Sequence, residues 1–138
     1  MRDFTEEAAA LFARFAERYG LQSESDASAP VEVLWRFPQQ ARLAHPIVLA
    51  LQNGDELNFG VGEFWSYFFP FDQKVEEFET IINSWVDGNA RVTQTSPWAY
   101  TLQVKDERGW TDAYSAGQVF PKLRRRPTLT NEWEGLGI

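Results

Sequence analysis

Two carboxylates stand out because aromatic residues flank them along the chain. Glu63 precedes the stretch "FWSYFF", and Asp112 lies between Trp110 and Tyr114. A carboxyl group against aromatic walls loses hydration, which raises its pKa and suits it to act as an acid. Two such acids facing one pocket would suit hydrolysis of a glycosidic bond. Glu63 and Asp112 are therefore retained as candidate catalytic residues.

His45 is the remaining candidate for chemistry. It is the single histidine of the chain, and histidine commonly serves as a general base or a metal ligand. There is no cysteine, and the carboxylates lack the spacing of metal ligands. We therefore expect neither a metal nor another cofactor. In the alternative interpretation, His45 is an ordinary loop residue before a strand.

The aromatic stretch after Gly62 raises the question of what covers it. In an extended chain, successive side chains point to opposite faces. One face would carry Phe64, Ser66 and Phe68, and the other would carry Trp65, Tyr67 and Phe69. The first set would pack against helices, whereas the second would need another layer, another subunit or a ligand. A bend at Gly62 would instead let the whole stretch enter one core.

Two helices are predicted on either side of this stretch. The first begins at Asp3 or Thr5 and ends at Gly20, because apolar residues recur at three- and four-residue spacing between them. The second spans residues 73–86, with Asp72 as its N-terminal cap. Each helix has one apolar stripe, so both need a sheet face to cover.

The strand pattern completes the predicted fold. Alternation or apolar runs predict strands at 31–37, 46–52, 57–62, 98–105 and 110–120, with 90–96 as a further candidate strand. Pro70 ends whatever strand the aromatic stretch 63–69 forms. Gly60 and Gly62 suit a bulge or the close approach of a backbone or ligand. We predict one α+β domain over 1–138, with a mostly antiparallel twisted sheet of five to six strands and two helices packed on one face, in the order α-β-β-β-α-β-β. The tail at 122–138 is expected to be irregular.

The charge of the chain limits its partners. The formal net charge is −7, which disfavours binding to nucleic-acid phosphates and favours a cationic partner. The basic cluster Lys122–Arg126 is interpreted as a solvated tail or an internal counter-charge, with anion binding as the alternative. No apolar window is long enough to span a membrane, and the first residues lack the apolar core of a signal peptide. We expect a soluble cytoplasmic protein.

These patterns favour a binding protein over an enzyme. We expect a non-enzymatic protein-binding domain that docks a protein partner, cationic in character, or a second copy of itself. A sheet face with Trp65, Tyr67 and Phe69 would make the contact, and Trp110 is a further binding candidate. An immunity- or adaptor-like protein that neutralises a basic toxin or nuclease would fit. The alternative is a small-molecule-binding domain, or a small hydrolase or isomerase, with an aromatic pocket and a carboxylate.

Overall fold

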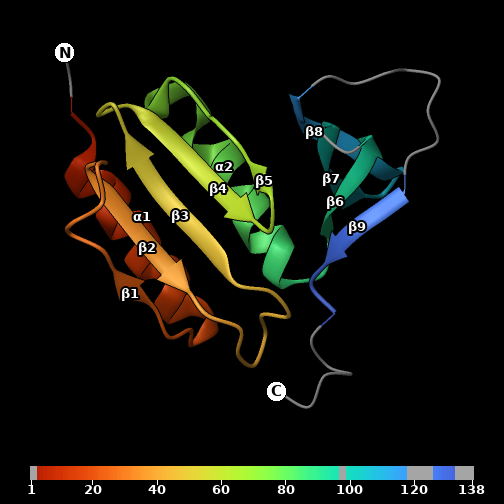
Figure 1. The fold of residues 1–138 in the computed structure, drawn as a ribbon, viewed down its shortest axis with the longest axis horizontal. Coiled ribbons are helices and arrows are strands. Elements are labelled where there is room, and N and C mark those ends of the chain that lie inside the picture. Colours follow the sequence, from red (N-terminus) through yellow and green to blue (C-terminus); the bar gives the residue numbers. More distant parts are fainter. Residues whose placement is uncertain (1–2, 97–98, 118–125, 133–138) are drawn as a thin grey trace.

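Two helices and nine strands make up the described part of the chain, which comprises residues 3–96, 99–117 and 126–132 of the computed structural model (Figure 1). The helices are α1 (Thr5–Tyr19) and α2 (Phe71–Val86). The strands are β1 (Glu24–Ser25), β2 (Val33–Phe37), β3 (Ile47–Gln52), β4 (Glu56–Val61), β5 (Phe64–Trp65), β6 (Ala90–Ser96), β7 (Ala99–Asp106), β8 (Gly109–Gly117) and β9 (Arg126–Thr130).

The strands form two antiparallel sheets. A five-stranded sheet has the order β1-β2-β3-β4-β5, and a four-stranded sheet has the order β8-β7-β6-β9. The predicted α+β class and the order of helices and strands are confirmed. The strands divide into two sheets, where one was predicted, because β5 is short and the chain turns into α2 soon after it. The strands that follow α2 then pair among themselves.

α1 follows the predicted apolar stripe. Its buried residues are Ala8, Leu11, Phe12, Phe15 and Tyr19. Their three- and four-residue spacing places them on one face of the helix. Gly20 ends the helix in the left-handed conformation, where glycine has no steric penalty.

α2 begins two residues earlier than predicted, and an aspartate other than Asp72 accepts a hydrogen bond from its first backbone N–H. Phe71 is the first helical residue, and its backbone N–H donates to Asp55 Oδ1 at 2.8 Å. Asp55 comes from the turn between β3 and β4, so a segment distant in sequence fixes the start of the helix. Asp72 lies inside the first turn, where the helix dipole favours a carboxylate, and its prediction as the cap was wrong.

Both helices cover the same face of the five-stranded sheet, and they lie behind it in Figure 1. The strand register places Trp35, Leu49 and Phe59 side by side on this face. The Phe12 ring of α1 lies 6.3 Å from the ring of Trp35 and 6.4 Å from that of Phe78 in α2, measured between centroids. Both helices therefore lie on one face of a sheet, as predicted, and aromatic contacts join them to each other and to that sheet.

The four-stranded sheet packs against the aromatic stretch that follows Gly62. Val92 and Leu102 are fully buried and belong to the same core as the inner face of α2. On β8, Tyr114 lies opposite Leu102. Its ring lies 6.0 Å from that of Phe64 and 5.3 Å from that of Phe68. The second sheet therefore packs against the inward-facing residues of the stretch.

The segment after β9 is anchored by one buried amide side chain. Asn131 Oδ1 accepts a hydrogen bond from the Ala44 N–H at 2.7 Å. Its Nδ2 atom donates to the backbone oxygens of Arg42 at 2.7 Å and Val86 at 3.1 Å. This amide therefore ties the loop before β3 and the end of α2 to the second sheet.

The expectation of an irregular tail over 122–138 needs correction for part of its length. Residues 126–130 form β9, which pairs with β6 because the outer edge of β6 offers unpaired backbone groups. Residues 122–125 and 133–138 lie outside the described part of the chain. The basic cluster Lys122–Arg126 therefore falls almost entirely outside it.

Replacing the buried amide tests its structural role. Asn131→Ala removes the partner of the buried Ala44 N–H, of the buried Val86 oxygen and of the part-buried Arg42 oxygen, and we expect it to lower the free energy of unfolding by about 3 kcal/mol. Gln40→Ala is the matched control, because Gln40 also makes three hydrogen bonds, but at an exposed site. It should cost less than about 1 kcal/mol. Urea titrations that give equal losses for the two variants would contradict this role.

Candidate functional site

The aromatic stretch after Gly62 divides residue by residue between core and surface. The buried set comprises Phe64, Ser66 and Phe68, and the outward set, here called the aromatic strip, comprises Trp65, Tyr67 and Phe69. Trp65 is half-buried, whereas Tyr67 and Phe69 are 49% and 61% exposed. The alternation predicted from sequence therefore extends to Phe69, and the alternative of a single core for the whole stretch was wrong.

Hydrogen bonds to β4 hold the backbone of the aromatic strip. The Ser66 N–H donates to the Phe59 oxygen at 3.0 Å, and Phe68 and Leu57 exchange backbone bonds of 2.8 and 3.0 Å. The buried Ser66 hydroxyl accepts from the N–H of Phe59 and donates to its oxygen. Asn58 Nδ2 donates to the Ser66 oxygen at 3.0 Å. The exposed rings therefore project from a backbone that is fixed to the sheet.

The chain's own side chains fill the space beside the two glycines of β4 and its turn. A Cβ atom at Gly60 would lie 2.5 Å from Trp65 Cε3, so the absence of a side chain lets the indole lie on the sheet. A Cβ atom at Gly62 would lie 2.9 Å from Leu129 Cδ1 of β9. The sequence predicted a bulge or the close approach of a backbone or a ligand at these glycines, whereas side chains of the same chain make the close approach.

The strip borders the face of the five-stranded sheet that the helices leave free. In Figure 1, no described helix or strand lies in front of this face. The register places Arg36, Val48, Gly60 and Trp65 in one row across it, from β2 to β5. We call this side of the sheet the open face.

Two neighbouring grooves lie on the open face, and together they are called the trough. The first groove, of about 370 Å³, has Trp65 at one end. The second, of about 310 Å³, has Glu24 and Arg36 at its far end. Pro46 and Val48 line both grooves, so the two adjoin each other over β3. The trough therefore has an aromatic end and a charged end.

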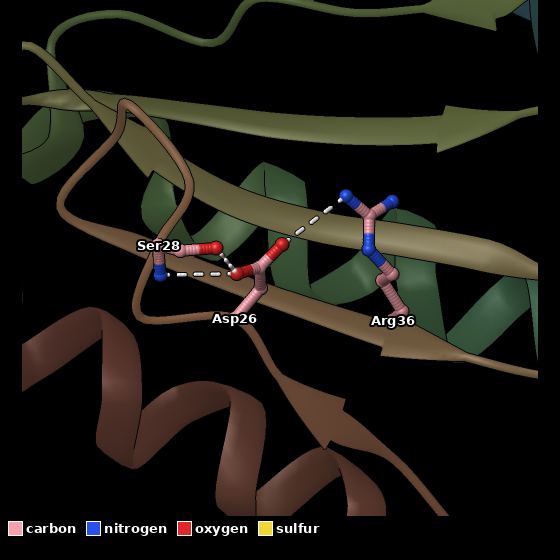
Figure 2. A network of polar contacts seen from close by, with 3 residues as sticks. All are labelled: Asp26, Ser28 and Arg36. Atoms are coloured by element: carbon pink, nitrogen blue, oxygen red, sulfur yellow. Dashed lines mark hydrogen bonds and ion pairs between the residues drawn. The ribbon is translucent and has the colours of Figure 1, made fainter.

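The charged end of the trough contains an exposed ion pair. Arg36, which lies opposite Glu24 in register, forms an ion pair of 3.5 Å with Asp26 (Figure 2). The other Asp26 oxygen accepts hydrogen bonds from the Ser28 hydroxyl and backbone N–H, and these bonds lower the pKa of Asp26. Arg36 is thus held by Asp26, and Glu24 has no ion-pair partner within the described residues.

A partly buried carboxylate lies on the open face beside the strip. Glu56 pairs with Gln52 and shares the face of Asn58, because side chains alternate along β4. Its Oε2 atom is buried without a hydrogen-bond partner. Burial raises the pKa of the Glu56 carboxyl, against smaller opposing effects of hydrogen bonds from Gln52 and Asn53.

The two candidate acids are both exposed and hydrogen-bonded to side chains of the second sheet. The Tyr100 hydroxyl donates to Glu63 Oε2 at 2.6 Å, and this bond is the main cause that raises the pKa of Tyr100. Asp112 Oδ1 accepts from Gln103 Nε2 at 2.8 Å. Tyr100 lies on the same face of β7 as Leu102, because two positions separate them. Gln103 lies on the opposite face.

A β-bulge keeps these acids apart. Tyr114 lies opposite Leu102, whereas Asp112 lies opposite Gln103, with a shift of register between them. Asp112 and Tyr114 therefore point to opposite faces of β8, although two positions separate them. Glu63 and Asp112 contact opposite faces of the four-stranded sheet, so they do not face one pocket. The geometry gives no support to paired acids for glycosidic hydrolysis.

Trp110 lies away from the aromatic strip, in a cluster that sequence reasoning missed. The guanidinium carbon of Arg91 lies 4.1 Å from the centroid of a Trp110 ring. Arg91 Nε donates to Gln103 Oε1 at 2.8 Å, and Gln103 in turn binds Asp112. The cluster draws on three strands, so no local pattern in the sequence indicates it. Trp110 is not part of the open face.

His45 is half-buried in the loop before β3, between residues that belong to other features. Ala44 binds the buried Asn131 amide, and Pro46 lines the trough.

In residues 3–96, 99–117 and 126–132, no cluster of three or more His, Cys, Asp or Glu side chains is suited to a metal ion. Within the same ranges, neither helix is long and apolar enough to cross a membrane.

The candidate site thus consists of the aromatic strip, the trough and the carboxylates at their border. Alternation in the sequence identified the strip, whereas the trough depends on strand pairing that the sequence does not give. Searches with the sequence and the fold found no matching protein-family model, curated protein or solved structure. The function of this chain is therefore inferred from the geometry of the candidate site.

A side chain at position 60 tests how Trp65 is seated. We expect Gly60→Ala to push the indole off the sheet and to lower the free energy of unfolding by about 1 kcal/mol, because the added methyl occupies the indole position. Resonances of the Trp65 indole N–H and urea titrations would measure both effects. In a Trp65→Ala background the same change should be almost neutral. Additive effects of the two substitutions would contradict this contact.

The raised pKa of Glu56 predicts that the stability of the fold depends on pH. Because its pKa is raised in the folded state, the folded protein holds the proton more tightly than the unfolded chain does. Its stabilising contribution is therefore present below the ordinary value of 4.5 and is lost as the pH rises through the raised pKa. Glu56→Gln should become more stable relative to wild type over this rise, measured as Tm against pH. The exposed Glu76→Gln is the control, and a Tm difference independent of pH would refute the prediction.

Proposed function

We propose that this chain is a non-enzymatic protein-binding domain that docks a basic protein partner through the aromatic strip and the open face. The observation that carries the proposal is the pair Tyr67 and Phe69, large rings that stay 49% and 61% exposed on a fixed backbone. Aromatic residues such as these are enriched at the centre of protein interfaces, and Tyr67 adds a polar hydroxyl to its rigid apolar ring.

The rigidity of the strip supports this function. Binding is weakened by the conformational entropy that side chains and loops lose at the interface. The Ser66 and Phe68 backbone groups are already bonded to β4, so little further ordering of the backbone is needed. Tyrosine and phenylalanine each have two rotatable side-chain bonds, so their own loss of entropy is small for the area that they bury.

Charge favours a basic partner over a second copy of the chain. Glu24 lines the trough, Glu56 lies on the open face beside the strip, and the chain has a formal net charge of −7. In a two-fold symmetric dimer through this face, two copies of the same acidic surface would lie against each other. A cationic partner would instead be attracted, and its association would be faster at low ionic strength.

The enzymatic alternative has less support. Glu63 and Asp112 contact opposite faces of the four-stranded sheet. The groove beside Trp65 is lined by apolar residues and glycines alone. A groove without a carboxylate, hydroxyl or histidine lining offers no group for acid–base chemistry. The proposed function includes an immunity- or adaptor-like role, in which tight binding neutralises a basic protein.

Removing the exposed rings tests the proposal. The immobilised chain would first be used to capture candidate partners. Each captured protein would then be purified, and its affinity for wild type and for Tyr67→Ser/Phe69→Ser would be measured by calorimetric titration. We expect a basic partner and a loss of affinity of at least about 100-fold, because two interface rings are removed. Since both rings are exposed, the variant should keep its fold, as circular dichroism would verify.

Trp110→Ser is the matched control for this experiment. It removes an aromatic side chain that is partly exposed on the second sheet and outside the open face. Affinity for the partner should remain within about twofold of wild type. Equal binding of the partner to wild type and to the folded Tyr67→Ser/Phe69→Ser variant would refute the proposed interface.

A further inference from the structure

We infer that the trough binds an extended segment of the partner, with an apolar side chain beside Trp65 and a lysine or arginine beside Glu24, six residues further along that segment. This inference rests on the proposed function and deepens it, since it defines the chemistry and spacing of the segment recognised. It is carried by the aromatic and charged ends of the trough and by the strand spacing between them.

The strand register sets the length of the segment. Glu24, Arg36, Val48, Gly60 and Trp65 lie in one row across five neighbouring strands. Four steps of about 4.8 Å between neighbouring strands separate the ends of the row by about 19 Å. An extended chain advances about 3.3 Å per residue, so residues i and i+6 lie about 20 Å apart. An even separation also points both side chains to the same side of the segment.

The shape of the trough favours an extended segment over a helix. Its two grooves, of about 370 and 310 Å³, meet over Pro46 and Val48. Alternate side chains of an extended segment would enter the two grooves in turn, with small residues over Pro46 and Val48. A helix about 10–12 Å across would rest on the borders of the trough instead.

The charged end of the trough selects a cation. Arg36 is held by its ion pair with Asp26, and Asp26 is fixed by two hydrogen bonds from Ser28 (Figure 2). Glu24 pairs with Arg36 in register but forms no ion pair in the described part of the chain. Glu24, Asp26 and Arg36 together have a formal charge of −1. A lysine or arginine opposite Glu24 would neutralise it.

Blocked heptapeptides added to the full-length chain test the inference directly. The probe LSASASK has its apolar and basic residues at i and i+6, and the control LSASAKS has the same composition with the basic residue at i+5, on the opposite side. A second control, LSASASE, reverses the charge. Backbone amide shifts of Val48 and Gly60 would report binding in two-dimensional NMR. LSASASK should bind at least about threefold more tightly than either control, the effect of one exposed charge pair.

Two substitutions complete the test. Glu24→Gln should weaken the binding of LSASASK about threefold, because it removes one exposed charge. The binding of LSASASE should be no weaker than to wild type. Trp65→Ser should weaken LSASASK about tenfold by removing the apolar end of the trough. Since Glu24 is exposed, its variant keeps the fold even if Trp65→Ser does not.

The outcomes separate this inference from the proposed function. Absent shifts at Val48 and Gly60, equal binding of the three peptides, or no effect of Glu24→Gln would overturn the inference. In those cases the proposed function would still stand if Tyr67→Ser/Phe69→Ser lost the partner. Sedimentation of a dimer that Trp65→Ser dissociates would also overturn the inference, because a second copy would then occupy the trough.

Discussion

The packing of two helices on one side of the five-stranded sheet is the constraint on which the rest of the molecule depends. The Phe12 ring of α1 contacts both Trp35 of the sheet and Phe78 of α2 on that side. A sheet of alternating side chains has two faces, and the described helices cover one of them. The open face and its trough exist because the chain has no third helix in the described residues to cover them.

The exposed rings owe their position to contacts made on the inner side of the same strand. Phe64 and Phe68 pack against Tyr114 of the second sheet, and Phe68 also packs against Phe78 of α2. Because the backbone alternates, burial of these residues forces Tyr67 outward. The second sheet therefore does not form part of the open face, but it determines which side chains that face presents.

The sequence predicted the features that depend on local spacing and missed those that depend on distant partners. Alternation identified which rings of the strip point outward, and helical spacing identified the buried stripe of α1. The cap of α2 by Asp55, the bulge that turns Asp112 away from Tyr114 and the trough could not be predicted. Each depends on which strands pair and in which register, and these are properties of the folded chain rather than of any window of residues.

The buried amide of Asn131 has a consequence for the nascent chain. It bonds Ala44 and Val86, which precede it by 87 and 45 positions. Ribosomes add about 5–20 residues per second, so Ala44 is made roughly 4 to 17 s before its partner exists. During that interval the N-terminal sheet lacks one of its fixed loops. The joint between the two sheets is therefore completed only after residue 131 has been made, and until then it lacks these buried hydrogen bonds.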